Sequence, residues 1–536
     1  MSKYIFITGG VISSLGKGVS SASIGKLLQL HGISVNIIKF DPYINVDPGT
    51  MNPYQHGEVF VTNDGIEADL DLGTYERFLD VETSKLNTNT AGDIYQTVIN
   101  KERKGEYNGD TVQIIPHITD EIKRRFTVFK NEYDVSIIEI GGTVGDIESL
   151  PFIEAVRQFQ FENEKNNIFN IHITLIPYIK SSYELKTKPT QHSVNKLREI
   201  GLCPDMLICR SEYSIDKSIK QKISKFCNVR ENYIIEALNE SSIYNIPEKF
   251  YKQKVDFLII NNLNLNKRKE IDTNWFKKIN FYNLRKRIRT IKKIRIAIIG
   301  KYSKFQDAYK SINESLNLAS IEEINTELEI CYLESENNNL ISLINNFDGI
   351  IVPGGFGNRG IEGKIKAINY SREHKIPFLG ICLGMQCAII EIARNLAKLK
   401  NANSTEFDKN TKYPVIKILD GQKNIKYVGG TMRLGHYESE IIKKTLAFNI
   451  YNKIKISERH RHRYEMNPEF ITRLEKEGLF VSAYHKKVLP EIIEIRNHPF
   501  FLGVQFHPEF ITRLEKVHPI FKEFVKAAIK FSSIKK

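Results

Sequence analysis

Short apolar runs alternate with helical stretches through the first half of the chain. The run at residues 3–10 (KYIFITGG) ends in glycines and precedes a helical stretch at 20–32 (SSASIGKLLQLHG). Further runs rich in β-branched residues lie at 34–40, 134–142, 169–178 and 205–210. Strands that alternate with helices in this way are typical of a parallel sheet with helices on both faces.

The same pattern begins again after a polar and basic interval. The second set of apolar runs lies at 293–302, 347–355, 376–382 and 501–509. A chain of 536 residues exceeds what one hydrophobic core normally serves. We therefore predict an α/β protein with two doubly wound parallel-sheet domains. The expected boundaries are 1–266 for the first domain, 267–293 for a basic linker and 294–536 for the second domain.

Composition and charge narrow the functional classes. The hydrophobic content is 41%, and no apolar run approaches the roughly 20 residues of a membrane helix. The N-terminus leads directly into a strand pattern without a secretory leader, so we expect a cytoplasmic protein. Residues 267–295 hold twelve Lys and Arg against two acids, which is +10 of the net charge of +14. This concentration favours a solvated connector over a nucleic-acid-binding surface, and we expect neither nucleic acid nor membrane as a partner.

A candidate nucleophile lies in the second domain. Cys382 stands between glycines in GICLG, after an apolar run and before the helical stretch MQCAIIEIAR. Glycines on both sides allow a tight strand-to-helix turn that exposes a nucleophile, and a helix N-terminus favours the thiolate. Six cysteines without paired CxxC spacing suggest neither zinc nor disulfides, and only Cys382 has a context that indicates chemistry.

The other parts of this site also have candidates in the sequence. His507 in FHPE is the expected base, and Glu509 would orient its imidazole. The flexible run VPGGFG supplies the N–H of Gly355, which with that of Leu383 could hold a tetrahedral oxyanion. Alone, each residue could be structural, but a glycine elbow, a PGG loop and a terminal HPE in this order favour a catalytic site.

These three motifs resemble those of class I glutamine amidotransferases over roughly residues 294–530. The resemblance implies a Cys382–His507–Glu509 triad that hydrolyses glutamine through a thioester and delivers ammonia to a partner domain. The residues implied to bind glutamine are Gly355, Leu383, Gly384, Met385, Gln386, Glu406 and Arg463. Among these, Arg463 would pair with the carboxylate of the substrate.

The first domain contains a candidate phosphate-binding loop. The run GGVISSLGKG at residues 9–18 follows a strand and opens a helix, so backbone N–H groups can face an anion and Lys17 can reach terminal phosphates. The loop departs from the Walker pattern, because five residues separate Gly10 from Gly16 and Gly18 replaces the metal-binding Ser or Thr. A magnesium ion must therefore be held elsewhere.

Two carboxylates are candidates for that magnesium ion. Glu139 ends the strand pattern DVSIIEI, and ligands of open α/β sheets bind at the carboxyl ends of strands. Asp71 lies in ADLDLGTYERF. Magnesium is normally held by one or two carboxylates together with phosphate oxygens. Asp71 alone could be a solvated loop acid, whereas burying Glu139 without a partner would be costly.

Five long strings together resemble the CTP synthase family over nearly the whole chain. They are GGVISSLGKG, KFDPYINVDPGTMNPYQHGEVFV, DGIEADLDLGTYERF, GGTVGDIES and KTKPTQHSV. The resemblance implies that the first domain is P-loop amidoligase-like and that the second is class I glutaminase-like. It also implies that ATP phosphorylates UTP, and that ammonia from L-glutamine then displaces phosphate to give CTP.

The resemblance carries over further site residues by position. The implied ATP-binding residues are Ser14, Leu15, Gly16, Lys17, Gly18, Val19, Asp71 and Arg210. The implied UTP-binding residues, which overlap the site for the inhibitor CTP, are Ser13, Asp146, Ile147, Glu148, Lys186, Thr187, Lys188, Pro189, Thr190, Gln191 and Lys222. Lys39 would assist phosphate transfer beside Lys17, and Asp71 and Glu139 would hold Mg²⁺.

Regulation and assembly are also implied only by the resemblance. His56 and Val59 match the region where the family gates its ammonia passage. The allosteric activator GTP would approach Phe356 and Arg359, and the family forms a homotetramer.

The sequence admits two other interpretations. A cobyrinate-type amidase with a related P-loop would keep the glutaminase and change the acceptor, but KTKPTQHSV and DPYINVDPGT argue against it. A nucleic-acid-binding or scaffold protein that has lost catalysis is opposed by the charge confined to one linker and by the intact Cys382, His507 and Glu509.

Overall fold

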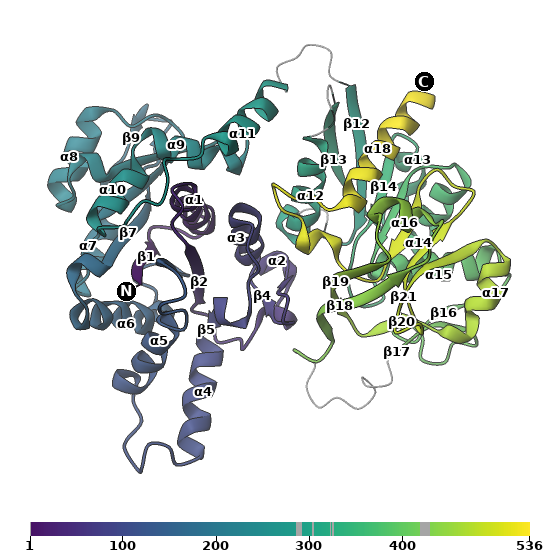
Figure 1. The fold of residues 1–536 in the computed structure, drawn as a ribbon, viewed down its shortest axis with the longest axis horizontal. Coiled ribbons are helices and arrows are strands. Elements are labelled where there is room, and N and C mark those ends of the chain that lie inside the picture. Colours follow the sequence, from purple (N-terminus) through teal and green to yellow (C-terminus); the bar gives the residue numbers. More distant parts are fainter. Residues whose placement is uncertain are drawn as a thin grey trace. The chain divides into compact units, whose positions relative to one another are not determined.

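The computed structural model describes residues 2–285, 292–302, 305–321, 323, 326–418 and 429–535. The chain divides into two compact units, each with its own sheet (Figure 1). One unit comprises Met1–Asp47 and Thr74–Phe281, and the other comprises Pro48–Gly73 and Tyr282–Lys536. The predicted boundaries did not foresee that residues 48–73 fold with the C-terminal unit.

The first unit is built on a seven-stranded sheet with the order β11-β10-β7-β1-β6-β2-β5, all of whose neighbouring strands are parallel. The strands are β1 (Lys3–Gly9), β2 (Val35–Asp41), β5 (Thr88–Thr90), β6 (Val135–Ile140), β7 (Ile168–Leu175), β10 (Met206–Ser211) and β11 (Ile234–Leu238). The helices are α1 (Lys17–Leu30), α4 (Ala91–Arg103), α5 (Thr119–Phe126), α6 (Leu150–Glu162), α7 (Lys188–Glu199), α8 (Lys217–Cys227), α9 (Ile246–Lys252), α10 (Val255–Asn262) and α11 (Asn274–Arg285). A short hairpin, β8 (Tyr178–Ile179) and β9 (Glu184–Leu185), precedes α7.

Both faces of this sheet are buried, as a parallel sheet requires. Tyr4 and Phe6 of β1 pack edge-to-face on rings of α5 and α6, with Tyr4 5.0 Å from Phe159 and Phe6 5.1 Å from Phe126. Ile5 and Ile7 alternate with them, are fully buried and point to the opposite face, where α1 packs on the sheet. The predicted α/β fold with helices on both faces is confirmed in this half.

The second unit contains a nine-stranded sheet with the order β13-β12-β14-β15-β23-β22-β21-β18-β19. Its parallel half is β13 (Thr326–Glu334), β12 (Lys292–Gly300), β14 (Gly349–Val352), β15 (Phe378–Ile381) and β23 (Phe501–Val504). The antiparallel half is β22 (Leu489–Ile495), β21 (Leu479–His485), β18 (Arg433–Ile441) and β19 (Lys455–His462). The predicted strands form β12, β14, β15 and β23 of the parallel half, whereas β13 and the whole antiparallel half were not predicted from the sequence.

The remaining elements of this unit surround that sheet. A small sheet contains β16 (Asn403–Ser404), β17 (Pro414–Ile418) and β20 (Tyr464–Met466), and a hairpin contains β3 (Phe60–Val61) and β4 (Glu67–Ala68). The helices are α2 (Pro53–His56), α12 (Lys310–Ser320), α13 (Leu340–Ile344), α14 (Ile361–Glu373), α15 (Leu383–Asn395), α16 (Leu446–Tyr451), α17 (Ile471–Lys476) and α18 (Pro519–Ile534). Helix α3 (Asp71–Leu79) begins in residues of this unit and ends in residues of the first.

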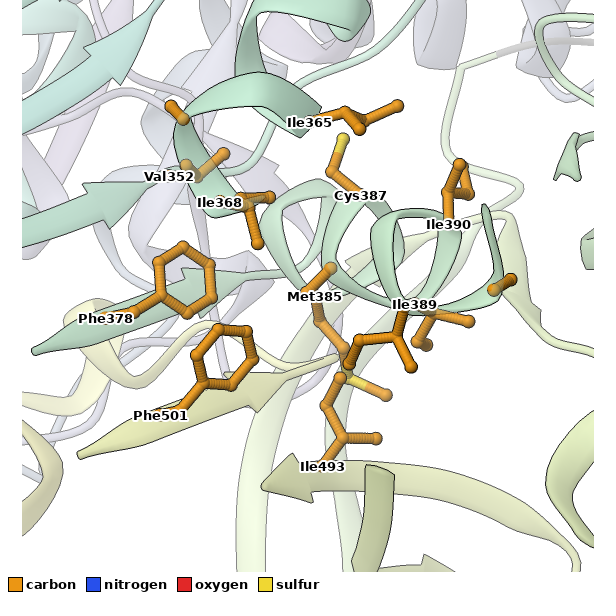
Figure 2. Close-up of a cluster of buried hydrophobic side chains, with 14 of the residues drawn as sticks. Val352, Ile365, Ile368, Phe378, Met385, Cys387, Ile389, Ile390, Ile493 and Phe501 are labelled. Carbon is orange, nitrogen blue, oxygen red and sulfur yellow. The ribbon is translucent and has the colours of Figure 1, made fainter. Parts of the chain in front are cut away.

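Helix α15 begins directly after the candidate nucleophile and packs against the sheet. Eleven of its thirteen residues are buried, from Leu383 to Ala393. Figure 2 shows Met385 and Ile389 of this helix in one apolar cluster with Phe378, Phe501 and Ile493 of the sheet. The apolar packing on the helix holds its N-terminal turn in place.

The predicted basic linker is only partly a connector. Trp275, Phe276 and Ile279 of α11 are buried in the first unit, and the N–H groups of Arg268 and Lys269 donate to the His31 carbonyl oxygen. Residues 286–291 lie outside the described part of the chain. Among the helices that the structure describes, none has the length and apolar character needed to cross a membrane.

Candidate active sites

Cys382 lies at the turn between β15 and α15. Its φ of 52° and ψ of −103° fall in a region that residues other than glycine seldom adopt. The flanking glycines allow this turn: a Cβ on Gly380 would lie 2.8 Å from the carbonyl group of Gly384, and one on Gly384 would lie 2.0 Å from the Val352 oxygen. The Cys382 N–H donates to the Val504 oxygen at 2.7 Å, so β23 holds the turn. The geometry is that of the predicted nucleophile elbow.

His507 and Glu509 form a buried pair next to this turn. Nδ1 of His507 lies 2.7 Å from Oε1 of Glu509, and the imidazole stacks on the Phe510 ring at 4.9 Å. On the other side, a Cβ built on Gly354 would lie only 2.8 Å from Cε1 of His507 and 3.6 Å from Cβ of Cys382. Only a glycine at position 354 therefore leaves the space in which the imidazole and the cysteine approach each other.

The environment of His507 favours the imidazolium. Burial acts to lower the pKa of His507, but the carboxylate of Glu509 and the neighbouring Cys382 outweigh it and raise the pKa to about 10. A positive imidazolium beside a cysteine sulfur stabilises the nucleophilic thiolate. The three predicted catalytic side chains are thus brought together in an arrangement that suits nucleophilic attack.

We expect the contribution of His507 to stability to be lost at high pH. Because its pKa is raised in the fold, the stabilisation is complete below the ordinary value of 6.5 and disappears as the pH rises through about 10. Glu509→Gln removes a charge that raises this pKa, so the variant should unfold more easily than the parent at pH 7. The difference should shrink toward pH 10. Calorimetric unfolding of both proteins across this range checks it, and a gap that does not change with pH would contradict it.

A cavity of about 270 Å³ opens beside the pair within the C-terminal unit. His507, Glu509, Gly355 and Phe356 contribute to its wall. Leu383 is the first residue of α15, and a Cβ on Gly355 would lie 3.4 Å from the Leu383 side chain. The two backbone groups predicted to hold an oxyanion therefore belong to neighbouring segments next to Cys382.

Two of the predicted glutamine-binding residues, Glu406 and Arg463, are charged. Glu406 accepts a hydrogen bond from the Gly357 N–H at 2.7 Å, and its burial raises the pKa of its carboxyl group. The cations Lys301, Lys364 and Arg463 act on Glu406 in the opposite direction. Arg463 donates to Thr431 Oγ1 at 3.1 Å. Glu406 is consequently a half-buried acid in a positive environment, which suits the binding of a zwitterion.

Two other predicted residues are held in the interior. Gln386 donates to the Tyr464 oxygen at 2.9 Å and to Oε1 of Gln505 at 3.3 Å. The Met385 side chain is fully buried in the hydrophobic core (Figure 2). Met385 and Gly384 can therefore offer only backbone groups to a ligand.

Sequence reasoning missed Gln505 and Lys364 in this region. Nε2 of Gln505 lies 3.7 Å from Sγ of Cys382. Lys364 is 1% exposed, its Nζ lies 4.0 Å from a Cβ built on Gly355, and burial lowers its pKa. Gln505 stands in the predicted FLGVQFHPE strand, where an internal polar residue was the available signal. The GKIK segment around Lys364 has the composition of a solvated helix and offered no signal.

In the first unit, the glycine-rich loop connects β1 to α1 as predicted. Val11, Ser14 and Gly16 all have positive φ values, of 81°, 59° and 85°. Lys17 is the first residue of α1 and donates from Nζ to the Gly142 oxygen at 2.8 Å. A Cβ on Gly10 would lie 1.5 Å from Oγ of Ser193, so α7 packs directly on this loop. The loop backbone and the side chain of Lys17 therefore lie at the carboxyl edge of the sheet.

Glu139 lies at the same edge and is fully buried with three hydrogen-bond donors. Its Oε1 accepts from Lys39 at 3.1 Å, and its Oε2 accepts from Ser21 at 2.7 Å and from Tyr75 at 2.6 Å. Lys39 and Glu139 are paired in the register of β2 and β6, and Lys39 also lies 3.6 Å from Asp41. The cost of burying an unpaired acid is thus avoided by a charged partner and two hydroxyls.

Glu139 offers the carboxylate oxygens that Mg²⁺ prefers, and it lies near the phosphate loop through its hydrogen bond from Ser21 on α1. Asp71 is half-buried at the start of α3, and its N–H donates to Asp69 at 2.9 Å. No cluster of three or more His, Cys, Asp or Glu side chains with metal-binding geometry occurs among the described residues. A magnesium ion held by Glu139 would need phosphate oxygens or water as its other ligands.

The residues predicted to bind UTP lie in two segments of the first unit. Asp146 accepts from the Thr143 N–H at 3.1 Å, and Ile147 and Glu148 after it are exposed. In the second segment, Gln191 donates to Thr187 at 3.0 Å, and Thr190 donates to the Leu175 oxygen at 3.0 Å. Lys186 pairs with Glu184, Lys188 and Lys222 are exposed, and Pro189 lies in the first turn of α7. The lysines are available to a ligand, whereas Thr190 serves the fold.

The remaining candidates have defined surroundings within their own units. Arg210 lies in β10, one residue before its end, and donates to the Leu238 oxygen at 3.1 Å and to Asn239 at 2.7 Å. Burial lowers its pKa. In the C-terminal unit, the Val59 side chain lines the cavity and His56 ends α2. The Phe356 ring lies 4.9 Å beneath the Arg461 guanidinium, and Arg359 donates to the Lys301 oxygen at 2.6 Å.

Comparison with known families matches both halves of the chain. Residues 3–265 match the family described as "CTP synthase N-terminus". Residues 304–527 match the family described as "Glutamine amidotransferase class-I".

Curated relatives match over almost their full lengths. A CTP synthase of Caldanaerobacter subterraneus is 52% identical over 535 residues, which cover 99% of this chain and 98% of that protein. A CTP synthase of Hydrogenobaculum sp. is 53% identical over 529 residues, with 98% of each chain covered. A CTP synthase of Cytophaga hutchinsonii is 51% identical over 542 residues, which cover 100% of this chain and 99% of that protein. Together with the elbow cysteine in one half and the phosphate loop in the other, these matches show that the chain belongs to the CTP synthase family.

Proposed function

We propose that this enzyme aminates UTP to CTP, using ATP and ammonia that it releases from L-glutamine. One observation carries the proposal: a single chain of this family holds two complementary sites. Cys382 stands in a strand–helix turn beside the buried His507–Glu509 pair, and Lys17 stands at a glycine-rich loop on the sheet edge that carries Glu139. The first site can release ammonia, and the second can bind phosphates.

The glutaminase half-reaction follows from the first site. Sγ of Cys382 attacks the side-chain carbonyl carbon of glutamine, and the N–H groups of Gly355 and Leu383 hold the oxyanion. His507, as the imidazolium, gives its proton to the departing nitrogen, so that ammonia leaves and a thioester remains. His507 then accepts a proton from water, which attacks the thioester and releases glutamate. Glu509 orients the imidazole through Nδ1.

Glutamine recognition is assigned to charged groups around the same cavity. Glu406 would pair with the substrate ammonium and Arg463 with its carboxylate, because opposite charges in a buried site define the orientation of a zwitterion. Gln386 and the backbone of Gly384 and Met385 would complete the pocket. The half-buried position of Glu406 among cations supports this assignment.

The ligation half-reaction is assigned to the first unit. The 4-oxygen of UTP attacks the γ-phosphorus of ATP, ADP leaves, and ammonia then displaces phosphate from carbon 4 to give CTP. Lys17 and Lys39 would neutralise the transferring phosphoryl group, while the backbone of residues 14–19 holds the other phosphates and Arg210 borders the nucleotide. Mg²⁺ bound by Asp71, Glu139 and phosphate oxygens would offset the remaining negative charge.

Pyrimidine binding and control are further parts of the proposal. Ser13, Asp146–Glu148, Lys186–Gln191 and Lys222 would bind UTP and, in an overlapping way, the inhibitor CTP. GTP would act as an activator near Phe356 and Arg359, and His56 and Val59 would border the route of ammonia. The assembly would be a homotetramer. The exposed lysines on and before α7 suit a triphosphate.

The direct test is to incubate the full chain with UTP, ATP, Mg²⁺ and glutamine and to measure CTP and glutamate together. We expect the two products in equal amounts. Glutamate release with no CTP would overturn the proposed acceptor while leaving the glutaminase intact.

Glu139→Gln should weaken the response of the enzyme to magnesium. The substitution keeps the shape and one acceptor oxygen but removes the charge that Lys39 and the metal share. We expect the half-saturating Mg²⁺ concentration to rise by about 10- to 100-fold, as for a loss of about 1.4 to 3 kcal/mol. Titration of Mn²⁺ binding to the ATP complex by electron paramagnetic resonance measures the same shift, and an unchanged affinity would exclude Glu139 as a ligand.

A further inference from the structure

Residues 48–73 are an unusual part of the C-terminal unit. In sequence they interrupt the first unit, between Asp47 and Thr74, yet they fold with the glutaminase half. Glu58 in this segment accepts from the N–H of Ser311 at 3.0 Å, and the Phe60 ring meets the Phe510 ring at 5.2 Å. The segment is therefore attached to the first unit by the chain and to the second by its contacts.

Arg461 of β19 binds the second half of this segment. Its Nε donates to Oε1 of Glu67 at 2.8 Å, and its Nη2 donates to the Gly49 oxygen at 3.1 Å. Glu67 is 3% exposed, and a Cβ on Gly49 would lie 2.1 Å from its Oε2. Glu67 and Arg461 thus form an ion pair, and Gly49 contacts both partners: its carbonyl oxygen accepts from Arg461, and its Cα lies against the carboxylate of Glu67.

Arg459, two residues earlier on the same strand, binds the hairpin tip. It is fully buried, and its Nε donates to Oδ1 of Asn63 at 2.7 Å while Nη1 donates to the Val61 oxygen at 3.0 Å. Side chains two apart on a strand share a face. Both arginines therefore reach the segment from the same side of β19.

The backbone of these two arginines contacts the catalytic pair. The Arg459 carbonyl oxygen accepts the His507 N–H at 2.8 Å, and the Arg461 oxygen lies 3.6 Å from Sγ of Cys382. Strand β19 thus presents side chains to residues 49–67 and carbonyl groups to the histidine and the cysteine. A shift of the segment that moves either arginine also moves a group in direct contact with the nucleophile or its base.

We propose that Glu67 and Asn63, acting through Arg461 and Arg459, are positioning residues that set the Cys382–His507 geometry according to the state of segment 48–73. The regulatory part of this inference rests on the proposed function, because Asp71, the proposed magnesium ligand, lies four residues after Glu67 in the same segment. Nucleotide and metal binding at Asp71 would then be coupled to glutamine hydrolysis through one continuous stretch of chain.

Glu67→Gln tests the proposal in the full chain. It removes the charge of the ion pair and keeps the shape of the side chain. Because a displacement of about 1 Å at a reacting group can cost about 100-fold, we expect the kcat for glutamine hydrolysis to fall by about 10- to 100-fold. The KM for glutamine and CTP formation from added ammonium chloride should not change, and alkylation of Cys382 by iodoacetamide should slow. Glu67→Asp, which keeps the charge, should restore part of the kcat.

Asp64→Asn is the matched control, since Asp64 is an exposed acid of the same hairpin that accepts from Thr62 at 2.6 Å. It should match the parent in every assay. An unchanged kcat in Glu67→Gln would overturn the proposal, as would an equal loss with glutamine and with ammonia. If Glu67→Gln does not fold, Asn63→Ser carries the same test through Arg459. Glutamate release is scored separately from CTP, so failure of the proposed acceptor would not be confused with failure of this coupling.

Discussion

Cys382→Ala is expected to abolish CTP formation from glutamine while leaving CTP formation from added ammonium chloride intact. The sulfur is the proposed nucleophile of the glutaminase site, and His507 beside it cannot form a thioester in its place. Removal of such a nucleophile should lower glutamine-dependent turnover by about 10⁴-fold or more. Ammonia-dependent turnover should stay near that of the parent, because Lys17, Lys39 and Glu139 of the proposed ligation site are in the other unit.

The appropriate control is Cys203→Ala, which removes an exposed cysteine. It should retain both activities. Loss of the ammonia-dependent reaction in a folded Cys382→Ala protein would contradict the division of the two half-reactions between the two sites. Mass spectrometry of the parent after treatment with a glutamine-analogue alkylating agent should find the label on Cys382.

Lys17→Ala is expected to stop CTP formation from either nitrogen source. Lys17 begins α1 at the end of the glycine-rich loop, where its ammonium can meet the terminal phosphates of ATP. Loss of one preorganised charge at a developing transition state costs about 10²- to 10³-fold, and we expect a loss of at least this size. Glutamate release measured without nucleotides should persist.

Lys130→Ala, at an exposed lysine of the same unit, controls for the change in net charge. Binding of ATP to Lys17→Ala should be measured alongside turnover. A variant that still makes CTP from ammonia at the parental rate would remove Lys17 from phosphate transfer.

Much of the fold was predictable because strand and helix patterns are local. The runs at 3–10, 134–142 and 376–382 predicted β1, β6 and β15, with their buried β-branched residues and terminal glycines. The antiparallel half of the second sheet was not predictable in this way. Its strand β19 reads KISERHRH, and the burial of Glu458, Arg459 and His460 in it depends on partners distant in sequence.

The repeated string PEFITRLEK shows the same limit directly. At 468–476 it forms a short turn followed by helix α17, with Glu469 exposed. At 508–516 the turn ends at Ile511 without such a helix, and Glu509 is buried against His507. Identical residues adopt two conformations because their tertiary surroundings differ. Local propensity therefore could not have distinguished the catalytic copy, whereas the preceding His507 could.

The candidate site was predictable where its residues carry local motifs. Three segments combine a reactive side chain with glycine or proline neighbours that can be recognised in the sequence. They are the elbow at Cys382, the HPE at 507–509 and the loop before Lys17. Gln505, Lys364 and Arg459 lack such a signature. Their importance arises only from what they touch: a sulfur, a glycine loop and the backbone N–H of His507.

The central claim is that ammonia released at Cys382 becomes the 4-amino group of CTP. The most direct measurement supplies the enzyme with UTP, ATP, Mg²⁺ and glutamine labelled with ¹⁵N at the side-chain amide, in the presence of excess unlabelled ammonium at a pH where little of it is free ammonia. Mass spectrometry of the CTP then reports the source of the nitrogen. We predict CTP that is predominantly ¹⁵N-labelled in the parent and unlabelled in Cys382→Ala. CTP without ¹⁵N from the parent, although labelled glutamine is consumed, would contradict the account.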